Sequence, residues 1–228
     1  MPESIALVNS AKAEQRLPQY VAVEGPIGVG KTTLATKLAR LLDYPLMLEP
    51  AAENPFLDRF YAEGASQALP TQLFFLLQRA KQVLDMPGND LLDRSLVADF
   101  MVEKDNLFAQ LTLDAEEFDL YQQIHSSLKM QPPNPDLVIY LQAPASVLQQ
   151  RVFRRGLSFE RAIDIDYLDV LADSYTEFFH YYDKAPVLIV NAAEIDFANN
   201  DAHFNALLEQ VLHMEGSRQF FNPNPTLL

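Results

Sequence analysis

The chain has 228 residues, of which 31 are acidic and 17 basic, giving a formal net charge of −14. This excess of negative charge argues against a nucleic-acid polymer as partner, because phosphate backbones bind to basic surfaces. The absence of cysteine excludes disulfide bonds and thiolate metal sites, and the length suits one α/β domain with a single core.

The first 19 residues mix acidic and basic side chains and contain no long apolar stretch. We therefore expect an N-terminal extension over 1–19, rather than a signal or transit peptide. No apolar run in the chain approaches the length of a membrane span, so we expect a cytoplasmic protein without a membrane partner. A single domain is expected over 20–214, and residues 215–228 lack periodicity and are expected to form a tail.

The segment 20–42 has the pattern of a strand, a phosphate-binding loop and a helix. An apolar run at 20–24 is followed by GPIGVGKT, which fits G-x-x-x-x-G-K-[ST], and then by apolar residues at helical spacing. Gly25, Gly28 and Gly30 would let backbone N–H groups face an anion, to which the helix N-terminus adds partial positive charge. The alternative is a glycine-rich turn that binds nothing, and the full motif in this context argues against it.

The residues that open this helix are candidates for nucleotide and metal binding. Lys31 could reach the β- and γ-phosphates of ATP, and the Thr32 hydroxyl could ligate Mg²⁺. Thr33 is a further candidate for nucleotide binding. The motif does not identify the second substrate.

Apolar runs and helical patterns alternate along the rest of the chain. This alternation predicts an α/β fold with a five-stranded parallel sheet and helices on both faces. The predicted strands are 20–24, 45–48, 90–92, 136–141 and 187–190. The predicted helices are 31–42, 55–62, 71–85, 95–108, 114–130, 144–155, 160–183 and 201–214.

Charged residues follow the second and third predicted strands, at the sheet edge where ligands of such folds bind. Glu49 could accept a proton from an attacking hydroxyl, Asp93 could hold Mg²⁺, and Arg94 could neutralise phosphate charge. The alternatives are a surface carboxylate at Glu49 and a local ion pair of Asp93 with Arg94, with Ser95 capping the next helix.

Arginines are concentrated near residue 155 in a chain that has few basic residues. Arg151, Arg154 and Arg155 fall within five residues, and Gly156 and Glu160 follow. Such a segment could act as a lid over 151–160 that closes on a triphosphate and excludes water. The alternative is a solvated helix terminus whose arginines face the helix dipole.

Taken together, these motifs resemble those of the deoxynucleoside kinases. They are GPIGVGKT, Glu49-Pro50, the DRS triplet at 93–95, and R-x-x-x-R-G-x-x-x-E over 151–160. The resemblance covers about 20–197. It implies a P-loop kinase fold with an Arg-rich lid, a homodimer, and ATP- and Mg²⁺-dependent phosphorylation of the 5′-OH of a deoxynucleoside.

The resemblance also implies roles for the charged residues. Glu49 would be the general base on the 5′-OH, Arg94 would contact that hydroxyl and the phosphate region, and Asp93 would assist the metal. Arg151 and Arg155 would clamp the phosphates.

Further residues would contact the nucleoside. Tyr61 and Gln72 stand at the spacing of family residues that contact the sugar 3′-OH and the base, and Glu160 stands where a lid carboxylate contacts the 3′-OH. The family lid usually reads R-x-x-x-R-x-R, and Leu157 replaces its last arginine.

Base choice is implied by two more positions. Relatives that prefer deoxycytidine or purine deoxynucleosides carry an Arg seven residues after the base-binding Gln, and Arg79 stands at this position. They also carry an Asp six residues after the acid of the triplet, and Asp99 stands at this position. The alternative is a helix–helix salt bridge between them.

Asn54 replaces an aromatic residue of some family members, which leaves Phe56 as a candidate wall of the base pocket. The smaller Asn54 favours a roomier, purine-accepting pocket.

Two rival functions remain. A nucleoside monophosphate kinase would need cations near an acceptor that already carries phosphate, and it would have less use for Glu49. A non-catalytic nucleotide-binding switch would leave the residues assigned to sugar contacts unexplained.

Overall fold

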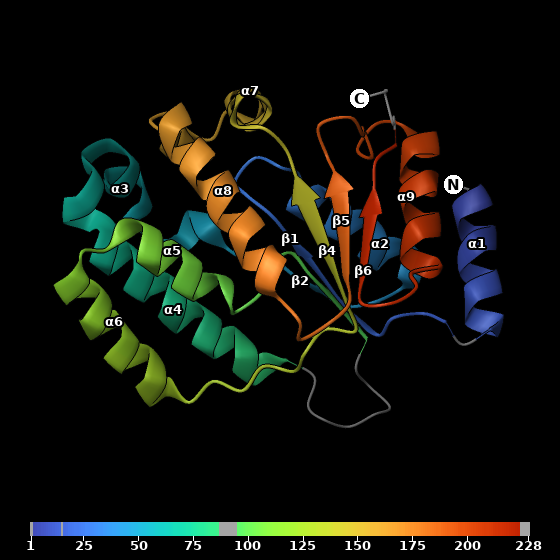
Figure 1. The fold of residues 1–228 in the computed structure, drawn as a ribbon, viewed down its shortest axis with the longest axis horizontal. Coiled ribbons are helices and arrows are strands. Elements are labelled where there is room, and N and C mark those ends of the chain that lie inside the picture. Colours follow the sequence, from blue (N-terminus) through green and yellow to red (C-terminus); the bar gives the residue numbers. More distant parts are fainter. Residues whose placement is uncertain (1, 15, 87–94, 224–228) are drawn as a thin grey trace.

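The computed structural model describes residues 2–14, 16–86 and 95–223. Its centre is a six-stranded, wholly parallel sheet with the strand order β2-β3-β1-β4-β5-β6 (Figure 1). The strands are β1 Tyr20–Glu24, β2 Leu46–Met47, β3 Leu96–Ala98, β4 Leu137–Gln142, β5 Val187–Asn191 and β6 Arg218–Phe221. The expected α/β fold is confirmed, but the predicted strand count of five is wrong, because β6 forms within the segment expected to be a tail.

Nine helices accompany the sheet in the described part of the chain. They are α1 Pro2–Ala13, α2 Lys31–Leu42, α3 Leu57–Glu63, α4 Ala68–Asp85, α5 Lys104–Thr112, α6 Ala115–Leu128, α7 Ala145–Arg155, α8 Ile165–Tyr181 and α9 Asp201–Leu212. None of these helices is both long and apolar enough to cross a membrane.

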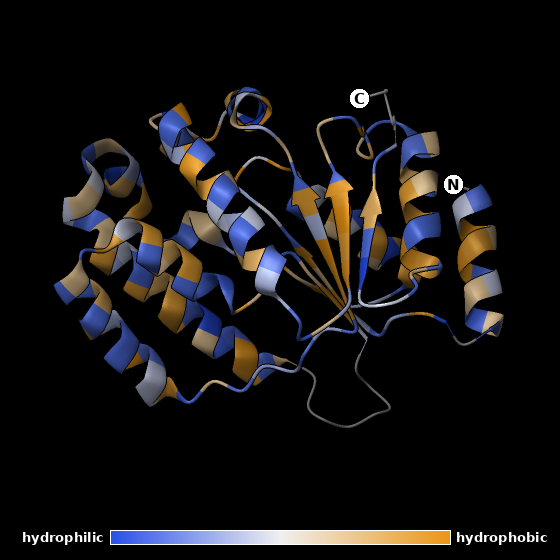
Figure 2. Ribbon diagram, viewed as in Figure 1, coloured by the Kyte–Doolittle hydropathy of each residue, from blue (hydrophilic) through white to orange (hydrophobic). Residues whose placement is uncertain are grey.

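Both faces of the sheet are covered, which explains why its central strands are continuous apolar runs. Alternate residues of β1 point to opposite faces: Val23 packs in one core with Leu34 of α2, and Ala22 packs in another with Tyr175 of α8. Helices α2 and α9 lie on the first face, and α5 and α8 on the second. Figure 2 shows the strands as the most hydrophobic part of the fold.

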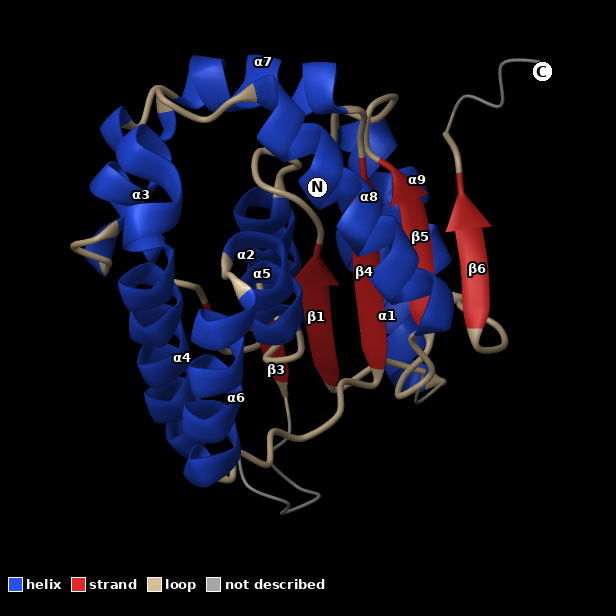
Figure 3. Cartoon of the chain, turned by 60° about the vertical axis from the view of Figure 1, so that its left-hand side comes forward, coloured by secondary structure: helices blue, strands red, loops and turns tan. Residues whose placement is uncertain are grey.

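The helices outside these layers shape the functional end of the sheet. Helix α4 packs against α5 and α6 on one flank of the molecule, and α7 lies beyond the carboxyl ends of the strands (Figure 3). The chain therefore surrounds the sheet edge at which β1 runs into the glycine-rich loop. The strand order also changes direction at β1, which is the usual position of a ligand site in open α/β sheets.

The region between α4 and α5 differs from the prediction. The predicted strand at 90–92 lies outside the described residues, and the helix predicted from residue 95 is wrong at its start. Leu96–Ala98 form β3, and α5 begins only at Lys104. A short apolar run such as this one fits a strand or a buried helix equally well, and its pairing with β1 and β2 decides between them.

The N-terminal residues form a helix that the sequence pattern did not predict. Helix α1 packs against α9 and α2, with Val8 and Ala11 buried. The Asn205 side chain of α9 donates to Glu3 at 2.7 Å and accepts a hydrogen bond from Ser4. Part of the segment 1–19 is thus an added layer on one face of the fold.

Candidate active site

The loop after β1 is shaped by glycines in conformations that other residues rarely adopt. Gly25, Gly28 and Gly30 have φ angles of 145°, 83° and 110°. A Cβ atom on Gly28 would lie 2.8 Å from the Leu148 carbonyl oxygen, and one on Gly25 would overlap the Leu141 carbonyl. The predicted loop geometry is therefore present, with a helix N-terminus directly behind it.

The side chain of Lys31 folds back onto this loop. Its Nζ donates to the carbonyl oxygens of Gly25 at 2.7 Å and Pro26 at 3.2 Å. Burial, followed by the nearby charge of Lys104, lowers the pKa of Lys31 from 10.5 to about 8. The exposed side chains of Thr32 and Thr33 follow, and the Thr32 hydroxyl donates to Asp99 Oδ2 at 2.5 Å.

Two hollows meet at this loop. The first is a cavity of about 300 Å³ between the loop, α3, α4, α5 and the segment after α7. The second is a cleft of about 610 Å³ between the loop, α7 and the segment 193–198. Both are lined by Gly28, Lys31, Thr32 and Arg155. A group held at Lys31 would therefore be accessible from both sides.

Arginines of α7 line the cleft. Arg151 donates to the Val29 carbonyl at 3.0 Å and to the Ala192 carbonyl at 2.7 Å, which ties α7 to the loop and to the end of β5. Arg154 and Arg155 also line the cleft. The predicted cluster is thus assembled beside the phosphate-binding loop.

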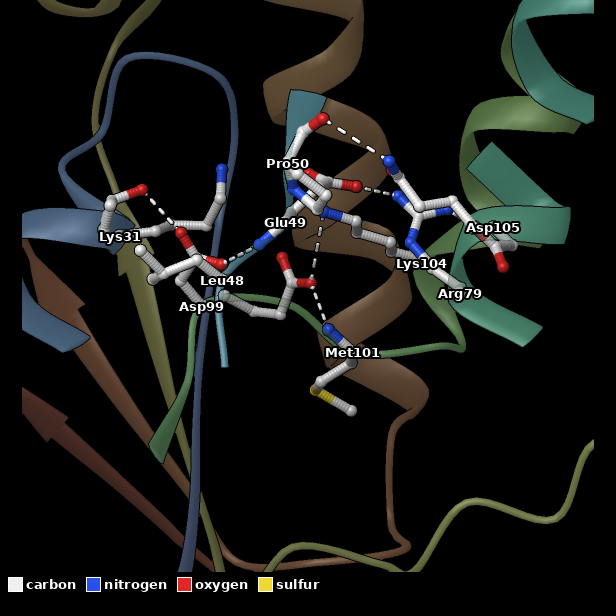
Figure 4. A network of polar contacts seen from close by, with 12 residues as sticks. Lys31, Leu48, Glu49, Pro50, Arg79, Asp99, Met101, Lys104 and Asp105 are labelled. Carbon is white, nitrogen blue, oxygen red and sulfur yellow. Dashed lines mark hydrogen bonds and ion pairs between the residues drawn. The ribbon is translucent and has the colours of Figure 1, made fainter. Parts of the chain in front are cut away.

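The inner end of the cavity holds a network of buried charges around Glu49 (Figure 4). Lys104 Nζ donates to Glu49 Oε2 at 2.7 Å, and Arg79 forms an ion pair with the other carboxylate oxygen. The backbone N–H of Glu49 donates to Asp99 Oδ1 at 2.8 Å. The Glu49 side chain is only 17% exposed, so the alternative of a surface carboxylate is wrong.

Opposing effects act on the pKa of Glu49. Burial raises it, but the charges of Lys104 and Arg79, the hydrogen bond from Lys104 and the charge of Lys31 together lower it from 4.5 to about 2. Glu49 is therefore ionised at neutral pH. A substrate that displaced one of these cation contacts would raise the pKa of Glu49 and make it a stronger base.

The predicted pairing of Arg79 with Asp99 is wrong. Arg79, on α4, forms ion pairs with Glu49 and with Asp105 on α5. Asp99 instead accepts hydrogen bonds from Thr32 and from the Glu49 backbone. The Arg79–Asp105 contact is a salt bridge between the packed helices α4 and α5, whereas the alternative salt bridge expected from the sequence joined Arg79 to Asp99.

The position of β3 explains this error. Asp93 and Arg94 lie outside the described residues, and the acid at the carboxyl end of the third strand is Asp99. Asp105 stands six residues after Asp99, so the spacing used to select Asp99 selects Asp105 once the motif is moved by six positions. The residue after Asp99 is Phe100, so no arginine follows the acid in this register.

Comparisons of the sequence with known proteins agree with a phosphate-binding loop beside a nucleoside-sized cavity. The deoxynucleoside kinase family profile matches residues 21–214. The chain belongs to the deoxynucleoside kinase family. A deoxyguanosine kinase of Bacillus subtilis is 33% identical over 197 residues, which cover 84% of this chain and 95% of the relative. A deoxyadenosine/deoxycytidine kinase of the same organism is 26% identical over 210 residues, covering 87% and 94% of the two chains.

Solved structures show the same fold. A deoxyadenosine kinase from M. mycoides, solved with dCMP and dCDP, superimposes with a TM-score of 0.73 at 24% identity, covering 86% of this chain and all of the other. The protein is thus an enzyme of the P-loop kinase fold, as its sequence indicated.

The outer part of the kinase's cavity is mainly aromatic. Tyr61, Gln72 and Glu160 line it, as the resemblance implies for residues that contact the nucleoside. Burial raises the pKa of Tyr61 well above its ordinary value, so its hydroxyl is neutral, and Gln72 Nε2 donates to Thr112 Oγ1 at 3.2 Å. The aromatic walls are Phe60, Phe75, Phe108, Phe159 and Tyr167.

Two expectations about the base pocket are wrong. Phe56 is not among the described residues that line the cavity; its ring packs edge-on against Phe74. Asn54 is not among the described residues that line the cavity either. Its side-chain amide donates a hydrogen bond to the Thr71 carbonyl at 3.2 Å, and its side-chain oxygen accepts one from the Phe56 N–H at 3.0 Å. Asn54 therefore gives no reason to expect a roomier pocket.

The segment 151–160, predicted to act as a lid, carries charged residues that line the cavity. Arg155 pairs with Glu160, which is buried, and Gly156 between them ends α7 with a φ of 71°. Leu157, which replaces an arginine of the usual family lid, lines the cavity. Among the described residues, the segment 151–160 thus contains an ion pair between two of its own residues, Arg155 and Glu160.

Sequence reasoning missed Lys104, Asp105 and Glu24. Asp105 would have been found from the motif spacing if β3 had been positioned correctly. Lys104 belongs to no motif, so no sequence signal identifies it. Glu24 ends β1 and accepts hydrogen bonds from the Gly25 N–H at 2.9 Å and the Met101 N–H at 2.7 Å, which fixes the loop against the segment after β3.

Another hollow lies at the opposite edge of the sheet. It measures about 600 Å³ and is lined in part by Gln19, Asp136, Pro186 and His213. Its strand residues come from the amino ends of the strands, away from the phosphate-binding loop. We therefore assign no role in catalysis to this hollow.

Proposed function

We propose that this kinase transfers the γ-phosphoryl group of ATP to the 5′-hydroxyl of a deoxynucleoside. The observation that carries the proposal is the meeting of the two hollows at Lys31 and Thr32. The arginine-lined cleft suits a triphosphate, and the aromatic cavity suits a base and sugar. Glu49 lies at the inner end of the cavity, where an acceptor hydroxyl would face the phosphate-binding loop.

The chemistry requires positioning and charge stabilisation more than covalent catalysis. Glu49 would accept the proton of the 5′-hydroxyl as its oxygen attacks the γ-phosphorus. Lys31 would leave its carbonyl contacts with Gly25 and Pro26 and bind the β- and γ-phosphates. Arg151 and Arg155 would neutralise charge on the transferred group and exclude water.

The donor atoms near the loop fit Mg²⁺, which prefers oxygen ligands and retains several waters. Thr32 and Asp99 supply a hydroxyl and a carboxylate that already contact each other at 2.5 Å. The described residues contain no cluster of three or more acidic or histidine ligands, so the phosphates of ATP would complete the coordination. When bound, Mg²⁺ would neutralise charge on these phosphates. We therefore propose Asp99, in place of Asp93, as the carboxylate that binds the metal.

The rival functions predict different sites. A nucleoside monophosphate kinase needs unpaired cations for the phosphate of its acceptor, but Arg79 and Lys104 are paired with carboxylates. A nucleotide-binding switch has no need of an aromatic cavity beside the phosphate-binding loop. The arrangement therefore favours a nucleoside acceptor.

Incubation of the enzyme with ATP, Mg²⁺ and each of the four common deoxynucleosides tests this proposal. We expect the 5′-monophosphate of at least one nucleoside as product. No phosphorylated product with any nucleoside would contradict the proposal.

We propose that a purine deoxynucleoside or deoxycytidine is the natural acceptor and that thymidine is a poor one. The support is the Arg79–Asp105 pair: Arg79 lines the cavity together with Gln72, and Asp105, which is not among the described residues that line it, holds the guanidinium in place. A fixed charged donor can bind the acceptor atoms on the polar edge of adenine, guanine or cytosine. Thymine would meet the pair with a 5-methyl group and with an N3–H between two carbonyls. The names of the relatives favour a purine, deoxyguanosine first.

Replacing Arg79 with Met and Asp105 with Ala together should raise thymidine turnover relative to that of deoxyguanosine. Arg79 also contacts Glu49, so turnover should fall for both acceptors, and the ratio of the two kcat/KM values is the quantity to measure. Each single change should chiefly lower activity, because it leaves a buried charge unpaired. An unchanged ratio in the double variant would mean that the pair is structural.

The lid should become more ordered when nucleotide binds. Its arginines repel one another until a polyphosphate is present, and Gly156 gives the backbone freedom to move. Amide hydrogen exchange over 151–160 should therefore slow on addition of ATP. Unchanged exchange there, in a sample shown to bind ATP, would indicate a surface feature instead of a lid.

We also propose a cytoplasmic homodimer. Large apolar side chains are exposed on α4 and α6, with Leu77 55%, Leu84 85% and Leu120 45% exposed. Such a surface on packed neighbouring helices is typical of an interface. The family resemblance implies a homodimer through the helices that flank the second and third strands, and α4 is one of these helices.

A further inference from the structure

Lys104 is a buried lysine that the mechanism above leaves without a role. It is the first residue of α5, it is 4% exposed, and it lines the cavity beside Glu49. Its ammonium lies 5.9 Å from the centre of the Phe100 ring. A lysine is rarely this buried without a specific partner.

The charges around Lys104 place it between two carboxylates. Its Nζ lies 2.7 Å from Glu49 Oε2 and 3.9 Å from Glu24 Oε1. An ammonium group has three N–H donors, and among the described residues Glu49 is its only hydrogen-bond acceptor. The remaining donors are therefore available to a group that enters the cavity next to Glu49.

That group would be the acceptor hydroxyl. An oxygen hydrogen-bonded to the Glu49 carboxylate lies within reach of an ammonium bound to the same carboxylate. Lys31 lies on the other side, in the phosphate-binding loop, and the charge of Lys104 contributes to the lowered pKa of Lys31. The two lysines thus approach the reacting centre from different elements.

We propose that Lys104 is a catalytic residue whose ammonium contacts the attacking 5′-oxygen and the phosphoryl group during transfer. This inference rests on the proposed kinase function. The 5′-oxygen forms a bond to the γ-phosphorus, the bond from that phosphorus to the β–γ bridging oxygen breaks, and ADP leaves. The hydroxyl proton passes to Glu49, and Lys104 keeps its own three protons.

Glu49 and Lys104 would have complementary roles in the reaction, one as proton acceptor and the other as a fixed positive charge. Before the reaction, Glu49 and Lys104 are an ion pair. Once Glu49 accepts the proton it becomes neutral, and the positive charge of Lys104 is no longer balanced by it. The ammonium then stabilises the negative charge that develops on the attacking oxygen and the transferred group.

A merely structural lysine would only neutralise Glu49 and Glu24. The two roles separate in a background in which Glu49 is already neutral. In the Glu49→Gln variant, a structural Lys104 has lost its main partner, so removing it should not slow the reaction further. A catalytic Lys104 still stabilises the phosphoryl group there, so removing it should.

The experiment compares Lys104→Met with Lys104→Arg in the wild-type background, and Glu49→Gln with the double variant Glu49→Gln/Lys104→Met. Lys81→Met, at an exposed position on α4, is the matched control. Each variant is measured for kcat and KM with the best deoxynucleoside, for its dissociation constant for that nucleoside by calorimetry, and for thermal stability. The double variant removes both charges, so it tests the role even if Lys104→Met alone fails to fold.

We expect Lys104→Met to lower kcat by roughly 10- to 100-fold, with little change in nucleoside binding. Lys104→Arg should recover part of the loss, and the double variant should be about tenfold slower than Glu49→Gln. Equal kcat in the two Glu49→Gln backgrounds would overturn the inference. If the wild type phosphorylates no deoxynucleoside, the proposed function fails instead, so the two failures are distinguishable.

Discussion

Replacing Lys31 with Ala is expected to abolish turnover, lowering kcat by roughly 10³-fold or more, the upper range for loss of a preorganised charge. Lys31 lies at the junction of the two hollows, and it is the cation of the phosphate-binding loop. Among the described residues, its ammonium forms hydrogen bonds only with loop carbonyls. The fold should therefore survive the change, and circular dichroism with thermal denaturation should match the wild type.

The matched control for this change is Lys81→Ala, at an exposed position on α4. It removes a positive charge far from the loop, so its kcat should remain at the wild-type value. The measurement is the steady-state rate of monophosphate formation at saturating ATP and nucleoside. Normal ATP-dependent activity in Lys31→Ala would defeat the assignment of the loop.

Replacing Glu49 with Gln is expected to lower kcat by roughly 10²-fold or more, the usual scale for a lost general base. Nucleoside binding should change only modestly, because the amide has nearly the shape of the carboxylate. The change also leaves Arg79 and Lys104 without their shared partner, so the thermal unfolding temperature should fall.

Glu53→Gln, on the same segment but with an exposed side chain, is the control for Glu49→Gln. It makes the same chemical change away from the cavity and should leave kcat unaffected. Both variants are compared by kcat, KM and nucleoside dissociation constant at one pH. A folded Glu49→Gln enzyme with near-normal kcat would remove Glu49 from the mechanism.

The central elements of this fold were predictable because local pattern and tertiary environment agree. The strands at 20–24, 136–141 and 187–190 are buried on both faces, so their apolar runs are unambiguous. The phosphate-binding loop is specified by glycines at defined spacing. Glu49 was found because it stands two residues after β2, which ends at the same edge of the sheet.

The region after α4 was misread for a physical reason. Its strand is only three residues long, and Leu-Val-Ala fits a helix as well as a strand until the neighbouring strands are known. The DRS triplet at 93–95 then took the place of Asp99, and the motif was displaced by six residues. The same displacement selected Asp99 as partner of Arg79, where the structure has Asp105.

Lys104 could not be predicted because its role depends on distance and not on spacing. It stands 55 positions from Glu49 in the chain, and only the packing of α5 beside the carboxyl end of β2 brings them together. The sixth strand was missed because edge strands such as β6 are only partly buried and have no clear apolar run.

Transfer of labelled phosphate tests the central claim most directly. The enzyme is incubated with Mg²⁺ and ATP labelled at the γ-phosphorus, and with a purine deoxynucleoside, its 5′-monophosphate, or its 5′-deoxy analogue, which lacks the hydroxyl. We expect label in the 5′-monophosphate when the nucleoside is supplied, and we expect neither of the other compounds to act as an efficient acceptor. Preferential labelling of the monophosphate to a diphosphate, or release of all label as inorganic phosphate, would contradict this claim.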